Sequence, residues 1–583
     1  MGRGILWVLR DRVRWHASRA FVLLVTALVG CTTTPASVGQ STAPRDTGQA
    51  DRPLVILVGV EPATVATRGF VQKGAGLHVA LRIFNALPTL IDARGQPQPE
   101  LLASIPALHT DTWQVFPDGT MRTLYTLRPN LTWHDGEPLT ANDFEFAWHV
   151  YSTPELGLAS QPPMSSITDL EVLDREHFVI NWSVPYPDAN TLSLYNREFP
   201  PLPQHILAGA FDQMASTGRD AFATNSFWGP EYIGAGPYRM QQWQQGGSID
   251  AIRFEGYPLG APKIARIQLR FGNDQNVVMA TLLSGEAHVA TDSSIAQAAE
   301  TLRAQWAQTN DGAVFRWPNA WHATAFQLRP DLANPNAILD VRVRKAIAHA
   351  IDKQAINEAV YAGQAIFADT PIWEGSAWGE ALDDSITTYP YDPRTTEALM
   401  SQAGFVKGSD RFYQGADGRL SLELVTNQNP DFVREILVMA DGLGRAGFDI
   451  QQKVLPSAQS RDGQVRATFP SMFTSNTNLG DSALNYLAIS QIPSQANRWV
   501  GGNRGGWVSP EFDRILSSFN TTLDRGERVD LVRQMLRIYS DDLPLVSLFF
   551  SAQPFAYVRG LTGPAIAVPE SNLAWNVYEW EFR

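Results

Sequence analysis

The stretch Tyr125-Thr-Leu-Arg-Pro-Asn-Leu-Thr-Trp-His-Asp-Gly-Glu-Pro-Leu-Thr-Ala-Asn-Asp-Phe144 predicts three local structures in a row. The alternation of apolar and polar residues from Gly119 to Leu127 is typical of a half-buried strand. Asp135-Gly136 predicts a turn. Thr140 is followed three residues later by Asp143, which resembles a capping box and predicts the start of a helix. A strand, a turn and a helix in succession favour a mixed α/β fold.

Strand and helix signals alternate through the rest of the chain without a repeat of fixed period. Continuous apolar runs and alternating patterns predict strands, and stripes at helical spacing with Asp residues before them predict helices. The interval Pro97 to Ala103 predicts a bend into a helical turn. The strands are expected at 54–60, 178–182, 238–243, 264–271, 420–426 and 544–550, and the helices at 77–86, 277–283, after Asp340, after Asp352, at 393–403 and at 432–443.

The N-terminus has the pattern of a secretory leader. An apolar run, Phe21 to Gly30, follows five arginines and one aspartate and ends at Cys31, the only cysteine of the chain. Ten helical residues rise about 15 Å, half of the ~30 Å hydrocarbon layer, so a membrane span is the less favoured interpretation. Leu28-Val-Gly-Cys31 resembles the bacterial lipobox, which predicts a signal peptide at 1–30 and a lipid on Cys31. The polar, Pro/Ser/Thr-rich residues 31–52 then form a flexible tether.

Composition narrows the class of protein. The formal net charge is −13, and residues 1–30 contribute +4, so the remainder carries about −17. This acidity argues against nucleic acid as a partner and against a polybasic membrane patch. A chain of 583 residues is too long for one hydrophobic core, so we expect two or more lobes.

Four segments resemble the family 5 extracellular solute-binding proteins, the large oligopeptide-, dipeptide- and nickel-type receptors of ABC importers. They occur in the order that the family has. The segments are residues 125–144; Gly234-Ala-Gly-Pro-Tyr-Arg239 with 282–289; Asp340 to Lys353 with Tyr361-Ala-Gly363; and Tyr391-Asp-Pro393 to Phe405 with Asp541-Asp-Leu-Pro-Leu545.

The resemblance implies a two-lobed α/β fold with a ligand cleft between the lobes and an extra subdomain in the N-terminal half. It places lobe I at 53–310, with the subdomain at about 86–195, lobe II at 311–535, and a return to lobe I at 536–583. A hinge would close the lobes on cargo, and the closed form would dock on an ABC permease. No cofactor, metal or catalytic residue is implied, and the protein is expected to be a monomer attached to the membrane only by its lipid.

Two motifs allow a chemical interpretation. His134, Asp135 and Glu137 lie together in sequence and predict, as the alternative, a secreted hydrolase. The turn and helix cap around them favour a structural role. Gly501-Gly-Asn-Arg-Gly-Gly506 resembles a phosphate loop, but it lacks the following Lys-Ser/Thr. It is similar to the family's Asn/Gly-rich loop, which predicts contact with ligand or with the opposite lobe.

Aromatic and polar residues in turn-like contexts are the candidates for cargo binding. In the family's peptide receptors an Asp pairs with the α-ammonium of the cargo. The corresponding position falls near Leu479, and Asp481 lies two residues away, so this anchor stays open. The candidate ligand-binding residues are Trp228, Trp321, Trp373, Asn427, Asn476, Asp481, Trp499 and Arg504.

These observations together predict a lipid-anchored, extracytoplasmic receptor in the cell envelope. It captures a peptide or similar polar solute and delivers it unchanged to an ABC importer. An oligosaccharide is the alternative cargo. A surface signalling or chaperone-like receptor that has lost its permease is a further alternative.

Overall fold

The computed structural model describes residues 52–70, 77–194, 197–291, 294–296, 298–460, 462–477, 479–565 and 573–583. The predicted signal peptide, tether and lipidated Cys31 lie outside these residues. Within the described part of the chain, no helix combines the length and the apolar character needed to cross a bilayer.

Eleven of the described strands form one mixed sheet. Their order is β19-β18-β20-β13-β21-β12-β1-β11-β10-β9, and the short β14 (Ile366–Phe367) pairs with β21. β1 is buried along its whole length and pairs in parallel with both neighbours, as its continuous apolar run requires. The bounds are β1 Leu54–Val58, β9 Tyr238–Gln244, β10 Ser248–Arg253, β11 Arg266–Phe271, β12 Val289–Thr291, β13 Gly312–Phe326, β18 Ser421–Thr426, β19 Asp449–Val454, β20 Met472–Thr477 and β21 Leu545–Val558.

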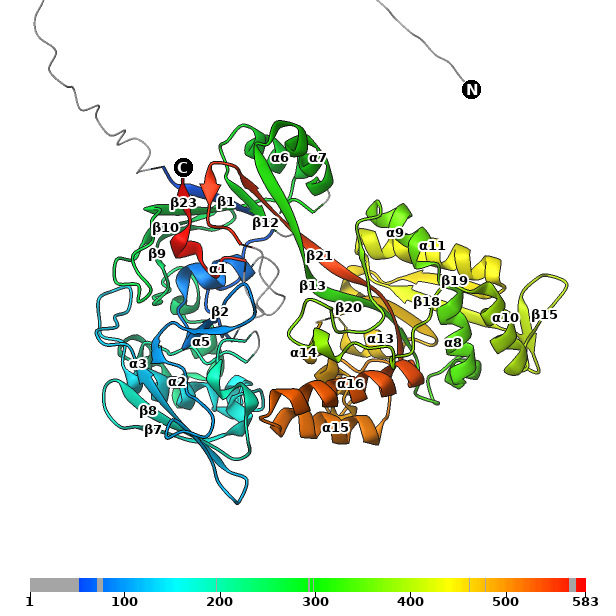
Figure 1. The fold of residues 1–583 in the computed structure, drawn as a ribbon, viewed down its shortest axis with the longest axis horizontal. Coiled ribbons are helices and arrows are strands. Elements are labelled where there is room, and N and C mark those ends of the chain that lie inside the picture. Colours follow the sequence, from blue (N-terminus) through cyan, green and yellow to red (C-terminus); the bar gives the residue numbers. More distant parts are fainter. Residues whose placement is uncertain are drawn as a thin grey trace, which may run out of the picture. The chain divides into compact units, whose positions relative to one another are not determined.

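Two long strands, β13 and β21, join the two halves of this sheet (Figure 1). They are antiparallel to each other, with Gly312 opposite Val558 and Ala325 opposite Leu545. The end of β21 pairs with β12, and the second part of β13 pairs with β20. The β13–β21 register shifts between Pro318 and Ala320, in the middle of the pair, and again between His322 and Ala323. A proline and a bulge both interrupt ladder hydrogen bonds, and the two coincide at the first shift.

Each half of the sheet has its own hydrophobic cores. We call the strands β1 and β9–β12 with their helices the N-terminal half, and β18–β20 with theirs the C-terminal half. The N-terminal half contains α1 Leu77–Phe84, α6 Gln275–Leu283 and α7 Ala299–Thr309. The C-terminal half contains α8 Val341–Ala350, α9 Lys353–Tyr361, α10 Pro393–Gln402, α11 Pro430–Ala446, α12 Ser457–Ser460, α13 Gly463–Ala467, α14 Asp481–Tyr486, α15 Pro510–Thr521 and α16 Arg525–Asp542.

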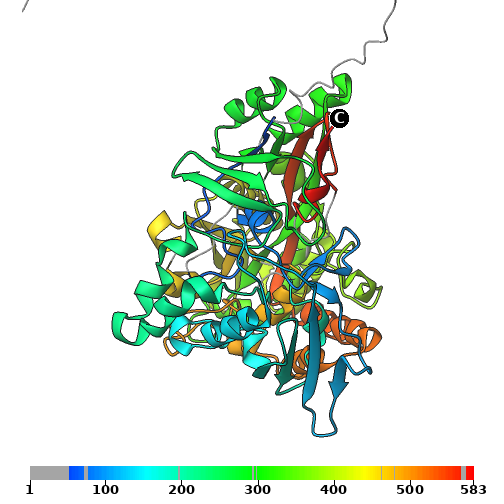
Figure 2. The same ribbon diagram turned by 90° about the vertical axis from the view of Figure 1, so that its left-hand side faces the viewer.

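A second sheet of five described strands lies between α1 and β9 in the sequence, and Figure 2 views the molecule from its side. Its strands are β4 Leu102–Ser104, β5 Trp113–Val115, β6 Met121–Leu127, β7 Ile167–Val172 and β8 His177–Trp182, and α2 Ala141–Tyr151 packs against it. Its aromatic core continues to Trp228 through α3 Gln204–Asp212, α4 Met214–Thr217 and α5 Arg219–Ala223. We call residues 102–228 the five-stranded region.

The remaining short strands form small sheets of their own. These are β2 Thr89–Ile91 with β3 Pro97–Pro99, β15 Val406–Lys407 with β16 Tyr413–Gly415 and β17 Gly418–Arg419, and β22 Leu561–Thr562 with β23 Glu581–Phe582.

The helix starts predicted at Asp residues are confirmed. The Asp340 carboxylate accepts the Arg342 N–H, and the Asp352 and Asp392 carboxylates do the same for α9 and α10. Pro393 occupies the first helical position, where its missing N–H costs nothing. At α2 the Asp143 carboxylate accepts the Thr140 N–H at 2.8 Å, as a capping box requires.

The helical turn predicted for 97–103 is wrong, because two strands, β3 and β4, occupy this interval. The reason is Glu100, whose side chain is buried between them. It accepts hydrogen bonds from Arg82 at 2.8 Å, from Tyr257 at 2.6 Å and from the Leu87 N–H at 2.9 Å. These partners come from distant parts of the chain, so the local pattern does not reveal them.

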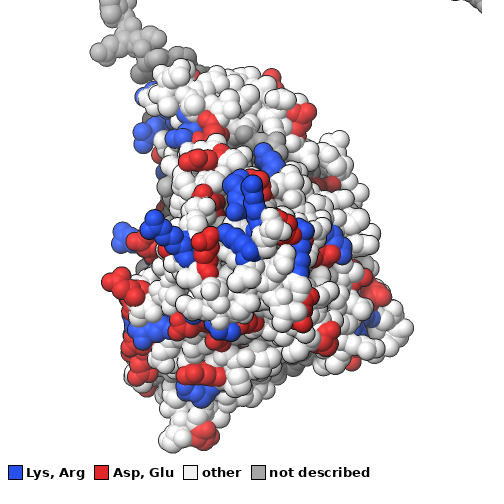
Figure 3. All heavy atoms as spheres, turned by 90° about the vertical axis from the view of Figure 1, so that its right-hand side faces the viewer, with Lys and Arg blue, Asp and Glu red and all other residues white. Residues whose placement is uncertain are grey.

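The face in Figure 3 carries acidic and basic side chains side by side. Exposed pairs of the C-terminal half such as Arg434–Asp431 and Lys407–Glu397 give such a mixture. Exposed pairs contribute little to stability, about 0–1 kcal/mol each. This mixture differs from two less exposed groups of charges described below.

Candidate functional site

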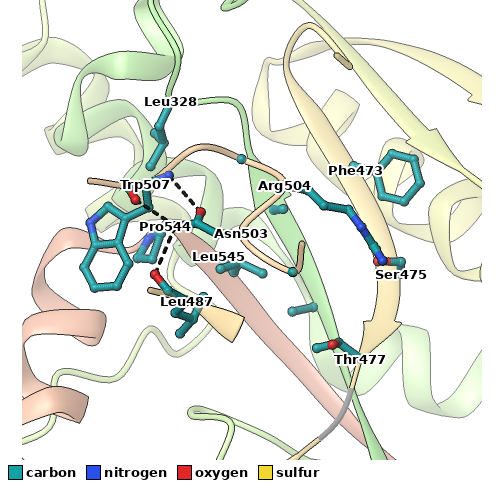
Figure 4. Close-up of a pocket in the computed structure, with 14 residues that line it drawn as sticks. Leu328, Phe473, Ser475, Thr477, Leu487, Asn503, Arg504, Trp507, Pro544 and Leu545 are labelled. Atoms are coloured by element: carbon teal, nitrogen blue, oxygen red, sulfur yellow. Dashed lines mark hydrogen bonds between the residues drawn. The ribbon is translucent and has the colours of Figure 1, made fainter. Parts of the chain in front are cut away.

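A small pocket lies in the C-terminal half, where β13, β20 and the start of β21 meet the loop that precedes α15 (Figure 4). Its free volume is about 30 Å³, which is room for about two water-sized groups. We call it the arginine pocket. It is lined by Ala323, Ala325, Leu328, Phe473, Ser475, Thr477, Leu487, Gly502, Asn503, Arg504, Gly505, Trp507, Pro544 and Leu545.

The loop that carries Arg504 is held tightly from both sides. The Asn503 side-chain amide donates to the carbonyl oxygens of Leu487 at 3.0 Å and Trp507 at 2.7 Å, and its Oδ1 accepts the Trp507 N–H. The Gly505 carbonyl accepts the Leu328 N–H at 2.7 Å. A Cβ on Gly505 would lie 2.2 Å from the Phe326 carbonyl oxygen, so only glycine fits there.

Arg504 extends from this loop across the pocket toward Ser475 on β20 (Figure 4). Its charged neighbour is Arg466 of α13, and burial together with that guanidinium lowers the pKa of Arg504 to about 9. Burial also lowers the pKa of Arg466. Both groups remain cations at neutral pH. Among the described residues, neither guanidinium forms an ion pair or a side-chain hydrogen bond.

A third arginine strengthens the positive field beside the pocket. The Arg329 guanidinium donates to the carbonyl oxygens of Arg504 at 2.7 Å and Pro493 at 3.2 Å, and also to the Ala467 carbonyl. These acceptors are neutral, so they do not cancel the charge of Arg329. Asp331 raises the pKa of Arg329, but burial outweighs this effect and keeps that pKa below its ordinary value. The pocket therefore has a positive electrostatic character in a protein whose net charge is −13.

A second group of buried charges is balanced. Asp188 and Arg197 of the five-stranded region meet Asp481 and Arg528 of the C-terminal half, and we call these four residues the ion-pair cluster. Arg197 contacts Asp188 and lies 3.1 Å from the Asp481 carboxylate, and Arg528 lies 3.4 Å from Asp188. The two arginines hold the pKa of Asp188 below its ordinary value against the opposing effect of burial.

The predicted chemical cluster does not converge. His134 is 5% exposed; its Nε2–H donates to the Gly236 carbonyl at 2.9 Å and its Nδ1 accepts the Gly234 N–H. Burial lowers the pKa of His134 to about 4, so the imidazole is neutral. Asp135 instead pairs with His205 at 2.9 Å, and Glu137 is exposed. The geometry therefore gives His134 a structural role as a link to the turn that contains these two glycines.

Two of the candidate tryptophans lie in cores. Trp228 is 3% exposed and its Nε1–H donates to the Phe222 carbonyl at 2.8 Å. Trp321 is 1% exposed and packs edge-on against Tyr539. Trp373 and Trp499 are half-buried, outside the arginine pocket.

Of the eight candidate binding residues, Arg504 alone lines the pocket in the described structure. Asn476 sits between the lining residues Ser475 and Thr477, and alternation along β20 exposes its side chain elsewhere. Asn427 accepts the Asn429 N–H at 2.9 Å in the loop after β18.

Sequence reasoning missed Ser475, Thr477 and Asn503. The alternation along β20 assigns Ser475 and Thr477 to one face and Asn476 to the other, which is the signal that was available. It also missed Arg197 and Arg528 as partners of the acidic side chains. No local pattern relates Arg197 to Asp481, because 284 positions separate them in the sequence.

The family model for bacterial extracellular solute-binding proteins, family 5, matches residues 103–497. The chain belongs to this family. The match spans the five-stranded region, β13 and most of the C-terminal half, including Asp188, Arg197 and Asp481.

Relatives and solved structures agree with this membership. A putative ABC transporter peptide-binding protein of Brucella abortus is 25% identical over 66% of this chain and 68% of its own length. The oligopeptide-binding protein of Thermus thermophilus, complexed with a pentapeptide, covers 92% of this chain and 97% of that chain at 21% identity and a TM-score of 0.72. NikA from Brucella suis in complex with Fe(III)-EDTA covers 91% and 100% at 16% identity and a TM-score of 0.74. The fold is therefore the two-lobed α/β fold of these binding proteins.

Proposed function

We propose that this protein is a lipid-anchored receptor that captures a peptide or similar polar solute outside the cytoplasmic membrane and hands it unchanged to an ABC importer. Family membership supports the receptor role. The peptide cargo is suggested by relatives whose names include peptide binding. The Fe(III)-EDTA complex of NikA shows that the same fold also holds other cargo.

The observation that carries the proposal is the pair of crossing strands. β13 and β21 are long enough to belong to both halves of the sheet, and their register shifts at Pro318/Ala320, between the two halves. A few residues that absorb changes in φ and ψ are enough for hinge closure. We place the hinge at this shift.

The position of the hinge sets the boundaries of the two lobes. Lobe I is 53–310 and lobe II begins at 311, directly before β13. The proposed end of lobe II at 535 falls inside α16, which continues to Asp542 and packs by Leu536 and Tyr539 in the C-terminal half. We therefore place the return to lobe I within β21, a few residues later than the sequence suggests.

The ion-pair cluster supports closure between the five-stranded region and lobe II. Arg197 lies within ion-pair distance of Asp481, although the two residues belong to regions with different hydrophobic cores. Such a contact favours the closed arrangement over an open one. The proposed cargo-binding residues are Arg504 in the pocket, with Trp373, Asn427, Asn476 and Trp499 outside it.

Native mass spectrometry of the mature protein in detergent tests the proposal. We expect a polar solute to co-purify and to leave unchanged on denaturation, and the intact mass to include the lipid on Cys31. A Cys31→Ser variant should lack the lipid and keep the solute. Conversion of the solute into product during incubation would contradict the receptor role.

A further inference from the structure

We propose that the cargo carries a carboxylate group, and that Arg504 binds this group in the arginine pocket, with the charge of Arg466 beside it. The inference rests on the proposed receptor function and narrows its cargo from polar solutes in general to organic acids, peptides with a free C-terminus among them.

The arginine pocket has more hydrogen-bond donors than acceptors. The Arg504 and Arg466 guanidinium groups have no acceptor among the described residues, and the Ser475 and Thr477 hydroxyls beside them have none either. Charges withdrawn from water are ordinarily paired, because an unpaired one loses hydration without compensation. Three donor groups line the pocket without an acceptor among the described residues, namely the Arg504 guanidinium and the Ser475 and Thr477 hydroxyls. This surplus indicates that the acceptor comes from outside the chain.

The second step is preorganisation. Asn503 ties the loop to Leu487 and Trp507, and close packing at Gly505 fixes its approach to β13. The loop therefore presents Arg504 without having to reorganise when cargo binds. Groups fixed in place lose less conformational entropy on binding, which raises affinity.

The third step is size. A free volume of about 30 Å³ admits a group of about two oxygen atoms, and the planar fork of an arginine matches the two oxygens of a carboxylate. The rest of the cargo would extend out of the pocket into the cleft. The pocket is too small to enclose a whole peptide or sugar, so it recognises one functional group.

The fourth step concerns the ammonium anchor. Asp481 is the nearest acid to the position expected for such an anchor, and it already faces the Arg197 guanidinium at 3.1 Å. Since this positive charge occupies the Asp481 carboxylate, an α-ammonium would have to displace Arg197. The structure thus favours recognition of the negative group of the cargo over its positive group.

Binding of ¹³C-labelled acetate to the solute-free mature protein tests the inference. We expect line broadening of acetate by the wild type and by Arg514→Met, a matched change at an exposed arginine of α15. Arg504→Met should weaken acetate binding roughly 10- to 100-fold, the range of a lost charge-assisted hydrogen bond. Arg504→Lys should restore only part of it, because the fork is lost.

Three results would overturn the inference. The wild type gives no broadening; Arg504→Met binds acetate as the wild type does; or inorganic phosphate displaces acetate at much lower concentration, which would assign the pocket to phosphate instead. Native mass spectrometry distinguishes failure of the carboxylate inference from failure of the receptor function. A co-purified solute without an acid group would support the receptor function and contradict the carboxylate cargo. Acetate binding by a protein that captures no solute would support the carboxylate site and contradict the receptor function.

Discussion

The ion-pair cluster and the arginine pocket both remove arginine charge from water, yet they differ in what surrounds that charge. In the cluster, Arg197 and Arg528 meet two carboxylates, so the charges sum to zero. At the pocket, Arg504 has the Arg466 guanidinium as its charged neighbour and no carboxylate. Removing charge from water is costly in both places, but only the cluster compensates that cost within the chain.

This difference separates a structural role from a binding role. A balanced group stabilises the folded chain and loses stability when one member is removed. An unbalanced group lowers the stability of the free protein and gains from a ligand of opposite charge. Removing a charged side chain should therefore lower the free energy of unfolding in the ion-pair cluster and leave it unchanged or raise it in the arginine pocket.

The largest effect is expected in the cluster. Asp188→Asn leaves Arg197 and Arg528 with one carboxylate between them, and should lower the free energy of unfolding by about 3–5 kcal/mol. Urea unfolding of the mature protein measures this. The control is Asp410→Asn, whose partner Arg419 is half-exposed at 3.5 Å, and which should change stability by less than about 1 kcal/mol. Equal effects of the two changes would refute the structural role of the cluster.

Acid titration separates the cluster from the buried histidine. The folded-state pKa of His134 is about 4, below its ordinary value of 6.5. Between pH 6.5 and pH 4, His134 is therefore protonated in the unfolded chain and neutral in the folded chain. Stability should fall by about 3 kcal/mol from this residue as pH decreases from 6.5 to 4. The pKa of Asp188 is also lowered, so the contribution of that carboxylate is present above its ordinary pKa and is lost only at still lower pH.

Urea unfolding at several pH values tests this, with His134→Asn as the comparison. The variant should show a shallower loss of stability between pH 6.5 and 4. An unchanged slope would show that His134 takes up its proton in the folded state as readily as in the unfolded one.

Arg504 and a buried arginine of α8, Arg344, should differ in the sign of their effect on stability. Arg504→Met should leave the stability of the cargo-free protein unchanged or raise it by about 1 kcal/mol, because an uncompensated charge is removed. Arg344→Met should lower stability by about 1–3 kcal/mol, since Arg344 donates to the carbonyl oxygens of Leu543 and Asp542 and both would lose their donor. Urea midpoints measure both. A loss for Arg504→Met as large as for Arg344→Met would make Arg504 structural.

The smallest effect is expected for Asp481→Asn in cargo binding. Because Arg197 holds this carboxylate, cargo affinity should change by less than about threefold, which is below 1 kcal/mol. Isothermal titration with the co-purified solute measures the affinity, and Arg504→Met in the same assay provides the scale. An Asp481→Asn loss larger than that of Arg504→Met would restore Asp481 as the anchor of an ammonium group.

Local patterns were enough for most of the fold. Apolar runs identified β1 and β18, and Asp residues before helical stripes identified α8, α9 and α10, because these signals depend on neighbours within a few residues. They failed at 97–103, where Glu100 is held by Arg82 and Tyr257. Of the site, they found Arg504 in its glycine-rich loop and missed the hydroxyls of β20.

The sequence by itself determined the mixed α/β class, the leader pattern, the helix caps and the family. Each of these depends on short stretches of sequence whose signal does not require knowledge of distant residues. Tertiary structure decided which charges meet. Asp481 is paired because the chain brings Arg197 to it across 284 positions, and Arg504 is unpaired because, among the residues described, no carboxylate arrives beside it. Electrostatic energy depends on distance in space and on burial, and neither can be counted along the sequence.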